Sequence, residues 1–306
     1  MTPILSICIP TYNRNEILDK SLQSLVKQDV FQQTNDVEIV ISDNTSTDNT
    51  HEIAEKYIAL YGNKIRYFKN EQNVEEKNFP LALSRGRGLY RKICNDTLIF
   101  APNSLQMMLD AINNSLNEKP VLFFINNDKD NRYCDTMNDF VLNASFMTTW
   151  IGGFGLWQED LYYLDYMDKF SHTRLPQTAV LLKMMSDKKK ALIIGAHYCN
   201  LARPSLSGGY NLSEVFIKNY LDLYKPYLDT GELSKEVYER ERWLVLRKHV
   251  LPRQFNVKHK FEYDKSDFWK YTKEYHKSSK FYWFILRAFI KKICHLNYLY
   301  LHSKHE

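Results

Sequence analysis

The chain has 306 residues, 44% of them hydrophobic and 25% charged, so it can build a substantial core and is neither a low-complexity nor a disordered protein. Its net charge of +5 is uneven, because residues 251–306 hold twelve Lys and Arg against five Asp and Glu while the first 250 residues are nearly neutral. The positive charge belongs to the tail, and no nucleic-acid-binding motif accompanies it.

The five cysteines are scattered and form no CxxC pair. Cys8 and Cys94 lie inside apolar runs, where cysteine acts as a small core residue. This usage is typical of a reducing cytosol and not of a disulfide framework. The first residues, MTPILSICIPTYNR, lack the basic region and cleavage site of a signal peptide, so we expect a cytoplasmic protein.

Apolar runs alternate with helical spacing in the first half of the chain. We expect strands over 4–9, 37–42, 64–68, 89–94 and 121–126, and helices over 14–28, 48–61, 77–86 and 104–117. This alternation implies crossover connections and a mostly parallel sheet covered by helices. Ligands of such sheets bind at the carboxyl ends of the strands. Here those ends are polar: PTYN (10–13), SDNTS (42–46), KNEQN (69–73) and NDT (95–97).

Gly62 is the first glycine of the chain, so neither a GxGxxG fingerprint nor a P-loop follows the first strand. Both motifs need glycines for the close approach of backbone to phosphate. Their absence argues against a dinucleotide-binding domain and against a P-loop NTPase.

The pattern changes after residue 140. Residues 148–160, TTWIGGFGLWQED, group two Trp with three Gly. Residues 191–200 are typical of a late strand, 203–211 of a loop, and the chain from 212 onward of helices. We therefore expect one domain over 1–211 and a helical, basic region over 212–306.

Four segments in order, ICIPTYNRNEILDKSLQSL, VEIVISDNTSTDNT, NVEEKNF and GLYRKICNDT, carry a resemblance to a known family. They resemble the family-2 glycosyltransferases of GT-A fold, which build bacterial capsular polysaccharide and lipopolysaccharide O-antigen. The resemblance implies a Rossmann-like α/β fold, here with a C-terminal helical extension. It also implies an inverting transfer of sugar from a nucleotide-sugar donor, UDP-linked by expectation, to a growing, lipid-linked glycan.

The resemblance assigns a donor site at the strand ends. Its members here are Pro10, Thr11, Tyr12, Asn13, Asp43, Asn44, Asn73, Lys77, Asn95 and Asp96. Asp43 matches the family carboxylate that accepts a hydrogen bond from the base edge, such as uracil N3. Asn44 stands where the family has a second Asp. Lys77 could reach a phosphate as a point charge, and a solvated surface lysine is an equal alternative.

The tripeptide Asn95-Asp96-Thr97 takes the place of the family's Asp-x-Asp, which holds Mg²⁺ or Mn²⁺ on the diphosphate. Asp96 matches the first carboxylate, and Thr97 replaces the second. Such a cation commonly uses one or two carboxylates together with phosphates and waters. We expect Asp96 to bind metal or donor, weakly until the donor is present; an Asp that only caps a turn is the alternative.

The catalytic base and the acceptor site are less constrained. An inverting transferase needs a base for the acceptor hydroxyl, which the family takes from a carboxylate in its second half. His172 and Asp160 are the two candidates here. The candidates for acceptor contact are Trp150, Trp157, Tyr210 and Asn211, with core packing as the alternative for the two Trp.

Residues 281–301 are apolar but too interrupted by charge to span a bilayer. Arg287, Lys291 and His295 recur at every fourth position, the pattern of an amphipathic helix that lies in a membrane interface. Neighbouring basic residues favour anionic lipid, so we expect peripheral attachment to the inner face of the cytoplasmic membrane. A helix docked on its own domain is the alternative.

Two other functions stay open at this point. A sugar-1-phosphate nucleotidyltransferase shares the α/β layout, although PTYNRN lacks the Gly- and Arg/Lys-rich loop that it would need after the first strand. A degenerate transferase, kept as a partner in a glycan-assembly complex, would account for the carboxylates missing at positions 44 and 97.

Overall fold

The structure, a computed structural model, describes residues 2–127, 129–202, 207–255 and 262–302. It divides into two compact units, Met1–Arg203 and Pro204–Glu306. The sequence placed this boundary after residue 211. The second unit begins earlier because β11 (Ser207–Asn211) pairs with β12 (Glu262–Asp264), which lies far along the same unit.

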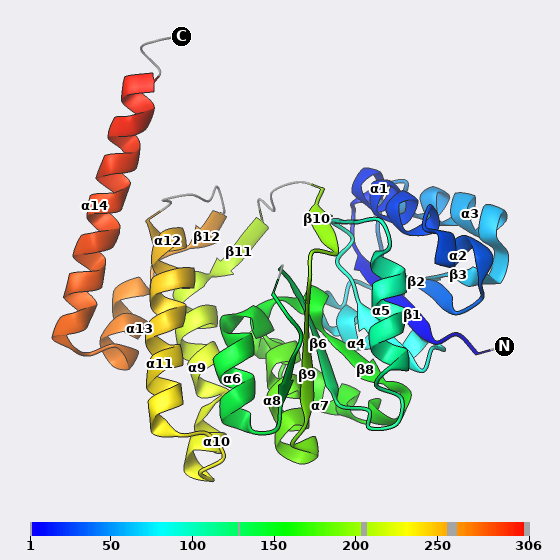
Figure 1. Cartoon of the computed structure of the whole chain (residues 1–306). Helices are drawn as coiled ribbons and strands as arrows, with labels where there is room; N and C mark the ends of the chain where they lie inside the picture. The colour runs from blue at the N-terminus through cyan, green and yellow to red at the C-terminus, as the bar shows by residue number, and fades with distance from the viewer. Residues whose placement is uncertain (1, 128, 203–206, 256–261, 303–306) are drawn as a thin grey trace. The chain divides into compact units, whose positions relative to one another are not determined.

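The first unit contains a five-stranded sheet in the order β3-β2-β1-β4-β8. Figure 1 labels β3, β2, β1 and β8 of this sheet. Its strands are β1 (Leu5–Thr11), β2 (Val37–Asp43), β3 (Ile65–Lys69), β4 (Tyr90–Ile93) and β8 (Gly155–Trp157). The first four of these in the sheet are mutually parallel, and β8 runs antiparallel to β4. The mostly parallel sheet expected from the sequence is confirmed.

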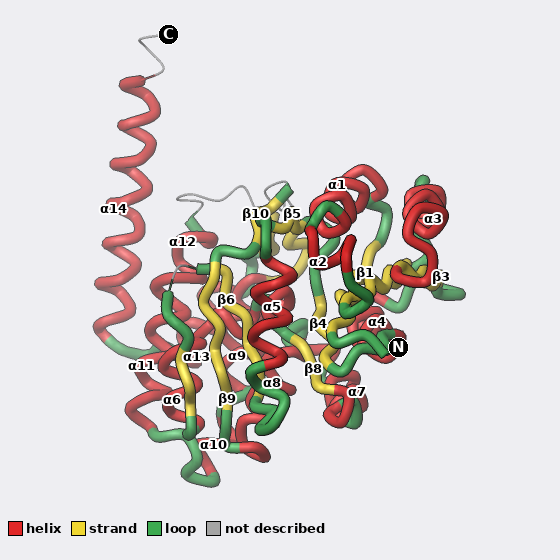
Figure 2. The backbone as a smooth tube through the Cα atoms, turned by 45° about the vertical axis from the view of Figure 1, so that its right-hand side comes forward, coloured by secondary structure: helices red, strands yellow, loops and turns green. Residues whose placement is uncertain are grey.

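A second sheet has the order β6-β9-β7, with β6 (Val121–Asn126) parallel and β7 (Arg132–Cys134) antiparallel to β9 (Ala191–Ala196). A two-stranded ribbon joins β5 (Leu98–Phe100) to β10 (Cys199–Leu201), and the two strands lie side by side in Figure 2. The single strand expected over 191–200 is thus two strands. The Asn126 side chain accepts hydrogen bonds from the backbone N–H groups of Tyr198 and Cys199, at 2.9 and 3.2 Å, and so holds the chain where it leaves β9.

Eight α-helices of the first unit lie within its described residues, and the helices expected from the sequence are confirmed with shifted ends. They are α1 (Asn15–Val26), α2 (Asp29–Gln33), α3 (Thr50–Tyr61), α4 (Asn78–Arg85), α5 (Ser104–Asn113), α6 (Met137–Ala144), α7 (Tyr163–Lys169) and α8 (Pro176–Lys188). The one-turn helix η2 (Glu75–Lys77) precedes α4, so the helix expected over 77–86 begins with a tighter turn.

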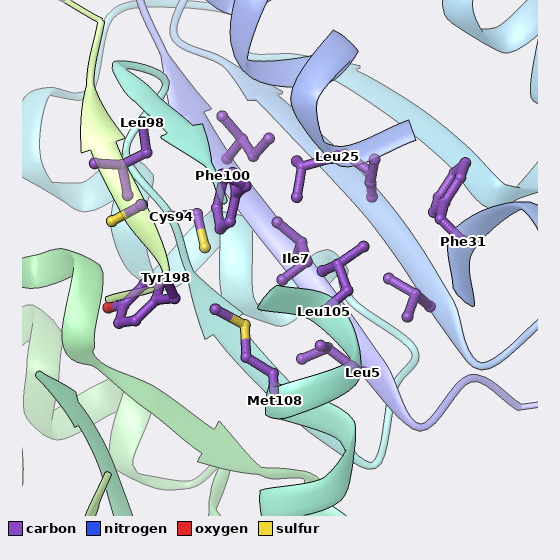
Figure 3. Packing of buried hydrophobic residues seen from close by; sticks show 14 of the residues in the cluster. Leu5, Ile7, Leu25, Phe31, Cys94, Leu98, Phe100, Leu105, Met108 and Tyr198 are labelled. Carbon is purple, nitrogen blue, oxygen red and sulfur yellow. The ribbon is translucent and has the colours of Figure 1, made fainter. Parts of the chain in front are cut away.

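The core of this unit lies between one face of the main sheet and helices α1 and α5 (Figure 3). Alternate residues of β1, namely Leu5, Ile7 and Ile9, are fully buried on this face. They meet side chains spaced three or four residues apart on the helices: Leu18, Leu22 and Leu25 of α1 and Leu105, Met108, Leu109 and Ile112 of α5. The apolar periodicity of the sequence therefore identifies this core.

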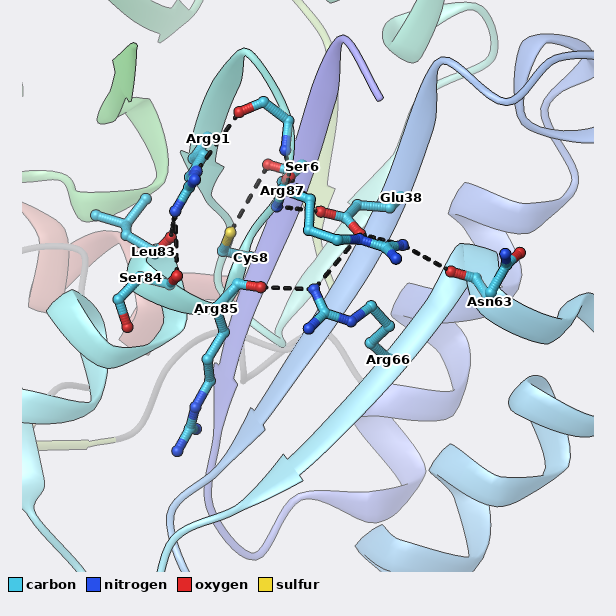
Figure 4. Close-up of polar contacts among 11 residues, drawn as sticks. Ser6, Cys8, Glu38, Asn63, Arg66, Leu83, Ser84, Arg85, Arg87 and Arg91 are labelled. Carbon is cyan, nitrogen blue, oxygen red and sulfur yellow. Dashed lines mark hydrogen bonds and ion pairs between the residues drawn. The ribbon is translucent and has the colours of Figure 1, made fainter. Parts of the chain in front are cut away.

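The opposite face of β1 and β2 carries a buried polar network (Figure 4). Glu38, 1% exposed, accepts hydrogen bonds from the Ser6 hydroxyl at 2.6 Å and from Arg87 Nε at 2.8 Å. Arg66 lies 3.7 Å from the same carboxylate. A Cβ added to Gly88 would lie 2.6 Å from the Ser6 backbone nitrogen, so only glycine allows the chain to pass this close.

The second unit is mainly helical, which confirms the expected C-terminal helical extension. Its described helices are α9 (Tyr220–Asp222), α10 (Lys225–Asp229), α11 (Lys235–Val245), α12 (Leu251–Gln254), α13 (Phe268–Tyr275) and α14 (Ser279–His302), with wider helical turns η7 (Glu214–Asn219) and η8 (Leu246–Val250). Phe281 and Phe284 of α14 pack against Phe268 of α13 and Trp243 of α11. Within the described residues, no helix is both long and apolar enough to cross a membrane.

Replacing Glu38 tests the polar network. Glu38→Ala leaves the Ser6 hydroxyl and the Arg87 guanidinium without their buried acceptor, so the free energy of unfolding should fall by about 3 kcal/mol. Urea unfolding followed by circular dichroism measures it. Asp19→Ala is the control, because it removes a partly exposed ion pair with Lys56 and should cost about 1 kcal/mol or less. Equal losses in the two variants would contradict a stabilising network at Glu38.

Candidate active site

A cleft of about 170 Å³ lies at the carboxyl ends of β1 and β2. The residues that line it are Pro10, Thr11, Tyr12, Arg14, Asn44, Glu75, Asn78, Phe79 and Asp96. Five of them, Pro10, Thr11, Tyr12, Asn44 and Asp96, are donor-site candidates from the sequence. The cleft therefore brings together residues that lie up to 86 positions apart in the chain.

The loops after β1 and β2 are joined by hydrogen bonds. Asn13 accepts one from the Thr47 backbone N–H at 2.8 Å and donates its own backbone N–H to Ser46 Oγ at 2.9 Å. The backbone N–H of Asn15 donates to Asp48 at 3.0 Å. Asn13 has a φ of 51°, a left-handed conformation that Asn tolerates better than most residues. Asn13 thus shapes the cleft without lining it.

Asp43 is fully buried and is not among the cleft residues. Its Oδ1 accepts the Ser46 backbone N–H at 2.8 Å, and its Oδ2 accepts the Tyr67 hydroxyl at 2.6 Å. Burial, together with this carboxylate, raises the pKa of Tyr67 above its ordinary value. Both oxygens of Asp43 are therefore engaged in holding the loop, and this placement does not support the expected contact with a base edge.

Asn44, the next residue, does line the cleft. Its Oδ1 accepts from Asn70 Nδ2 at 3.0 Å and from the Val74 backbone N–H at 2.9 Å, while its Nδ2 donates to Asn73 at 2.6 Å. Asn73 thereby supports Asn44 from behind instead of lining the cleft. Lys77 is exposed and pairs with Asp168 at 3.3 Å on the surface.

Asp96 is 1% exposed and lies at the junction of two strand ends. Its Oδ2 accepts the Thr11 hydroxyl at 2.8 Å, and its Oδ1 pairs with Arg14 Nη1 at 2.9 Å. Burial raises the pKa of Asp96, and the Arg14 guanidinium and the Thr11 hydroxyl oppose that rise. Two parts of the chain more than 80 residues apart are held together by this one carboxylate.

The residues around Asp96 do not fit a divalent cation as the structure arranges them. Both carboxylate oxygens already have partners, one of them a cation. Thr97 adds no second carboxylate, so a cation at this tripeptide would depend on Asp96 alone. Asn95 has a buried Oδ1 that accepts no hydrogen bond, which a single donor from a ligand would satisfy.

Asp160 lies away from the cleft, contrary to its prediction as a candidate base, and Trp157 takes the core packing that was the alternative to acceptor contact. Trp157 pairs with Tyr90 in the sheet, and Tyr90 pairs with Leu5 at the start of β1. Trp157 therefore lies at the edge of the sheet where the parallel strands begin. Trp157 is 1% exposed and donates its indole N–H to the Pro120 carbonyl at 2.8 Å. Asp160 follows directly, is buried, and pairs with Lys188. The antiparallel direction of β8 was not visible in the sequence and accounts for this correction.

His172 is exposed, and its Nδ1 lies 2.9 Å from the Lys169 carbonyl oxygen. It does not line the cleft. Its segment is tied to the rim, because Arg174 pairs with Glu76, which adjoins the lining residue Glu75. His172 as the base stays a prediction.

Trp150 lines a second cleft, of about 200 Å³, together with Leu98, Asn126, Met147, Cys199, Asn200 and Leu201. Its ring stacks on Tyr198 with centroids 5.9 Å apart. A Cβ at Gly152 would lie 2.7 Å from the indole, so glycine is required there for this ring position. Tyr210 and Asn211 belong to the second unit, where Tyr210 packs on Phe216 and Tyr263 and Asn211 donates to Asp264 at 3.2 Å.

Sequence reasoning missed Arg14, Glu75 and Phe79 as cleft residues. Arg14 stands in the quoted PTYNR segment, and the signal for its role was the lone Asp at 96, since a buried carboxylate needs a counter-charge. Asn78 binds both the hydroxyl and the carbonyl of Ser42, at 2.6 and 2.8 Å. No local sequence pattern predicted these two hydrogen bonds.

Comparison with known proteins identifies the segment that builds this cleft. Residues 6–146 match the model of the family described as Glycosyl transferase family 2. The match includes every residue that lines the cleft. Over these residues the chain is similar to glycosyl transferase family 2. The resemblance expected from the sequence is confirmed.

The curated relatives of the family-2 segment match over short stretches. Abequosyltransferase RfbV of Salmonella typhimurium is 38% identical over 106 residues, which cover 34% of this chain and 31% of the relative. GalNAc(5)-diNAcBac-PP-undecaprenol beta-1,3-glucosyltransferase of Campylobacter jejuni is 33% identical over 76 residues, 25% of this chain and 23% of the relative. The matches thus span less than a third of either relative.

Solved structures support the fold over a longer range. Staphylococcus aureus TarS 1–349, in complex with UDP-GlcNAc, aligns with a TM-score of 0.52 at 17% identity over 80% of this chain and 72% of that chain. The mannosyltransferase PcManGT of Pyrobaculum calidifontis, in complex with GDP-Man and Mn²⁺, aligns with a TM-score of 0.51 at 14% identity over 96% of this chain and 88% of that chain. The GT-A fold is confirmed; at these identities the likeness shows the fold alone.

The Tyr67 hydroxyl provides a test of the arrangement at Asp43. Tyr67→Phe leaves Asp43 Oδ2 buried without a donor, so the free energy of unfolding should fall by about 2 kcal/mol, the size of a hydrogen bond to a charged group. Urea denaturation measures the change. Tyr133→Phe, at a tyrosine that is 66% exposed, should change stability by less than about 0.5 kcal/mol. A Tyr67→Phe protein as stable as this control would refute the buried hydrogen bond.

Proposed function

We propose that this chain is a glycosyltransferase that moves a sugar from a nucleotide-sugar donor to a cell-surface glycan. The observation that carries the proposal is the cleft at the carboxyl ends of β1 and β2, lined by Thr11, Tyr12, Asn44 and Asp96 within a family-2 segment. In parallel α/β sheets this edge is where ligands bind. UDP-GlcNAc and GDP-Man in two structures of the same fold favour a nucleotide sugar as the ligand class.

The polar groups of the cleft suit such a donor. Tyr12 is 44% exposed and offers a flat aromatic face to a base or sugar. Asn95 precedes the lining residue Asp96 but does not itself line the cleft; its buried Oδ1 accepts no hydrogen bond, and a sugar hydroxyl is a donor of the right kind. Pro10 and Thr11 hold the wall of the cleft at the end of β1, where the core fixes the strand.

The proposed reaction is an inverting displacement. The acceptor hydroxyl attacks the anomeric carbon as the bond to the nucleoside diphosphate breaks, and a base on the acceptor side takes the hydroxyl proton. His172 is the candidate base that remains on the rim side, since Asp160 lies at the opposite edge of the sheet. The apolar cleft around Trp150 is the candidate acceptor subsite. No step of this proposal uses Mg²⁺ or Mn²⁺, because Asp96 is already paired.

A lipid-linked acceptor, and attachment of the protein to the membrane that holds it, form the second part of the proposal. The Campylobacter relative carries an undecaprenol-linked glycan in its name. In the second unit, α14 exposes a row of large apolar side chains, each 49–65% accessible: Tyr282, Trp283, Leu286, Phe289, Ile290 and Ile293. Phe281, on the other side of the helix, is buried against α13.

The charge around this row suggests the kind of membrane. Arg287 lies among the exposed apolar residues, with its guanidinium over the Trp283 ring at 4.6 Å. The side chains of Lys291 and His295, which the sequence placed on the same stripe, fall outside the described residues. An apolar face with basic neighbours favours the surface of an anionic membrane. We therefore propose a cytoplasmic protein peripheral to the inner face of the cytoplasmic membrane.

Nucleotide binding tests the proposed function. Calorimetry with UDP, GDP, CDP and ADP, each with and without Mn²⁺, should give a dissociation constant below about 1 mM for at least one nucleotide. Incubation with the matching panel of nucleotide sugars should then release that nucleotide by slow hydrolysis. Absence of binding by every nucleotide would refute the transferase proposal, and binding without any hydrolysis or transfer would favour a degenerate assembly partner.

Vesicle flotation tests the α14 surface. The full chain should float with phosphatidylglycerol vesicles more than with phosphatidylcholine vesicles. The double variant Leu286→Ser/Ile290→Ser should lose at least about tenfold in partitioning, because each buried aliphatic side chain contributes about 2 kcal/mol.

Leu60→Ser is the matched control, since Leu60 is 66% exposed on α3 in the other unit. It should float like the unchanged protein. Equal flotation of the double variant and this control would refute the membrane role. A concentration-dependent dimer that the double variant abolishes would assign the face to a second copy instead.

A further inference from the structure

Asp96 is the one carboxylate that the NDT tripeptide offers, and the structure shows it engaged on both oxygens. Thr11 donates to Oδ2 at 2.8 Å, and Arg14 pairs with Oδ1 at 2.9 Å. The carboxylate is 2% exposed, whereas the Arg14 side chain is 42% exposed. The pair therefore has a fixed, buried anion and a cation that reaches into the open cleft.

Arg14 is the only basic residue among the described residues that line this cleft. Its guanidinium uses one terminal nitrogen on Asp96, and no other described group takes its remaining N–H donors. A guanidinium has five such donors in a rigid fork that matches phosphate oxygens. The unused donors and the exposed part of the side chain are both available to a ligand.

The other cations near the cleft are committed elsewhere. Lys77 pairs with Asp168 on the surface, and Arg174 pairs with Glu76 at the rim. Arg85 donates to Ser42 and Asn70 inside the polar network behind the cleft. Among the described residues, none of these other cations lines the cleft.

We propose that Arg14, held by Asp96, binds the diphosphate of the donor in place of a divalent cation. This inference rests on the proposed transferase function. Asp96 is then a positioning residue for Arg14 and not a metal ligand, and Thr11 fixes the carboxylate from its other side. The guanidinium neutralises the charge that develops on the departing nucleoside diphosphate, a task that a pre-positioned cation performs without rearrangement.

Glu75 takes no part in the proposed binding of the diphosphate. Glu75 is the other acid of the lining, is exposed, and can keep its carboxylate in water. Asp96 is offset by its ion pair, so the diphosphate meets the free edge of a guanidinium and not a bare carboxylate. A metal ion at the same place would first have to remove Arg14 from Asp96.

Two single variants distinguish a diphosphate bound by Arg14 from a metal ion bound by Asp96. The two arrangements predict opposite orders for the loss of nucleotide affinity. Asp96→Asn keeps a neutral oxygen for Arg14 but removes the charge that holds the guanidinium, so nucleotide affinity in EDTA should fall by about threefold. Arg14→Gln removes the diphosphate contact and should weaken binding by about tenfold or more. If Asp96 held a metal ion, Asp96→Asn would be the damaging change and Arg14→Gln would be tolerated.

The experiment is calorimetry with the nucleotide that binds the unchanged full chain best, in EDTA and again in Mn²⁺. Arg14→Lys should recover part of the affinity lost in Arg14→Gln, since it restores the charge without the fork. Arg132→Gln is the matched control, because Arg132 is exposed on β7 and its loss removes the same charge outside the cleft.

Folding is controlled with the double variant Arg14→Gln/Asp96→Asn. It removes both charges together, so no buried carboxylate is left unpaired. Urea unfolding confirms that each variant is folded. Since Asp96 acts through Arg14, the double variant should bind no more weakly than Arg14→Gln alone.

The outcomes separate this inference from the proposed function. Binding in EDTA within about threefold of binding in Mn²⁺, with a larger loss in Arg14→Gln than in Asp96→Asn, supports the proposal. Binding that requires Mn²⁺, or a loss larger in Asp96→Asn than in Arg14→Gln, overturns the Arg14 role and leaves the transferase proposal standing. Failure of every nucleotide to bind the unchanged chain, with and without Mn²⁺, overturns both.

Discussion

The in-register parallel pairing of β1 with its two neighbours is the constraint on which the rest of the first unit depends. Leu5 lies beside Val37 on one side and Tyr90 on the other, and Thr11 lies beside Asp43. β1 is buried on both faces, with Leu5, Ile7 and Ile9 in the apolar core and Ser6 in the polar network. Because these two different faces fix its register, the three strands end at one edge. Every residue proposed to meet the donor follows from that edge, and the reversed strand β8 carries its own loop to the other edge.

Two buried aspartates then hold the edge together, and they do so in different ways. Asp43 acts locally, because it accepts from a backbone N–H three residues on and from the Tyr67 hydroxyl on the next strand. Asp96 acts at long range, because its partners Thr11 and Arg14 come from the start of the chain. Neither carboxylate is exposed, so neither acts by direct access from water. Their role in the structure is to place Asn44 and Arg14, which do face the cleft.

The sequence predicts most of the fold, because apolar periodicity reports burial directly. Leu18, Leu22 and Leu25 or Leu5, Ile7 and Ile9 identify a helix face and a strand face without any knowledge of partners. The alternation of such segments then gives the parallel sheet. Periodicity does not show the direction of a strand. The sequence therefore did not predict that β8 runs antiparallel to β4.

The same reasoning explains which site residues were predicted. Pro10, Thr11, Asn44 and Asp96 could be named because they stand at strand ends in a recognised pattern. The hydrogen-bond partners of the carboxylates could not, because Tyr67 and Arg14 reach them only through the tertiary fold. Because the Tyr67 partner was not visible in the sequence, Asp43 was predicted to bind the base of a ligand. A residue type shows which groups a side chain can bind. The partners that it already has in the folded protein decide which of its donors and acceptors remain for a ligand.

The charge around Asp96 shows how the missing second carboxylate at Thr97 bears on chemistry. Two neighbouring carboxylates repel each other and are stabilised by a divalent cation, whereas one buried carboxylate is balanced by one guanidinium. The pair of Asp96 with Arg14 is therefore complete in itself, with Thr11 occupying the remaining oxygen. Since the anion is buried and the cation is partly exposed, the charge that the pair presents to the cleft is positive. The lone carboxylate of the NDT tripeptide thus makes the edge of the sheet receptive to phosphate through the residue that it holds.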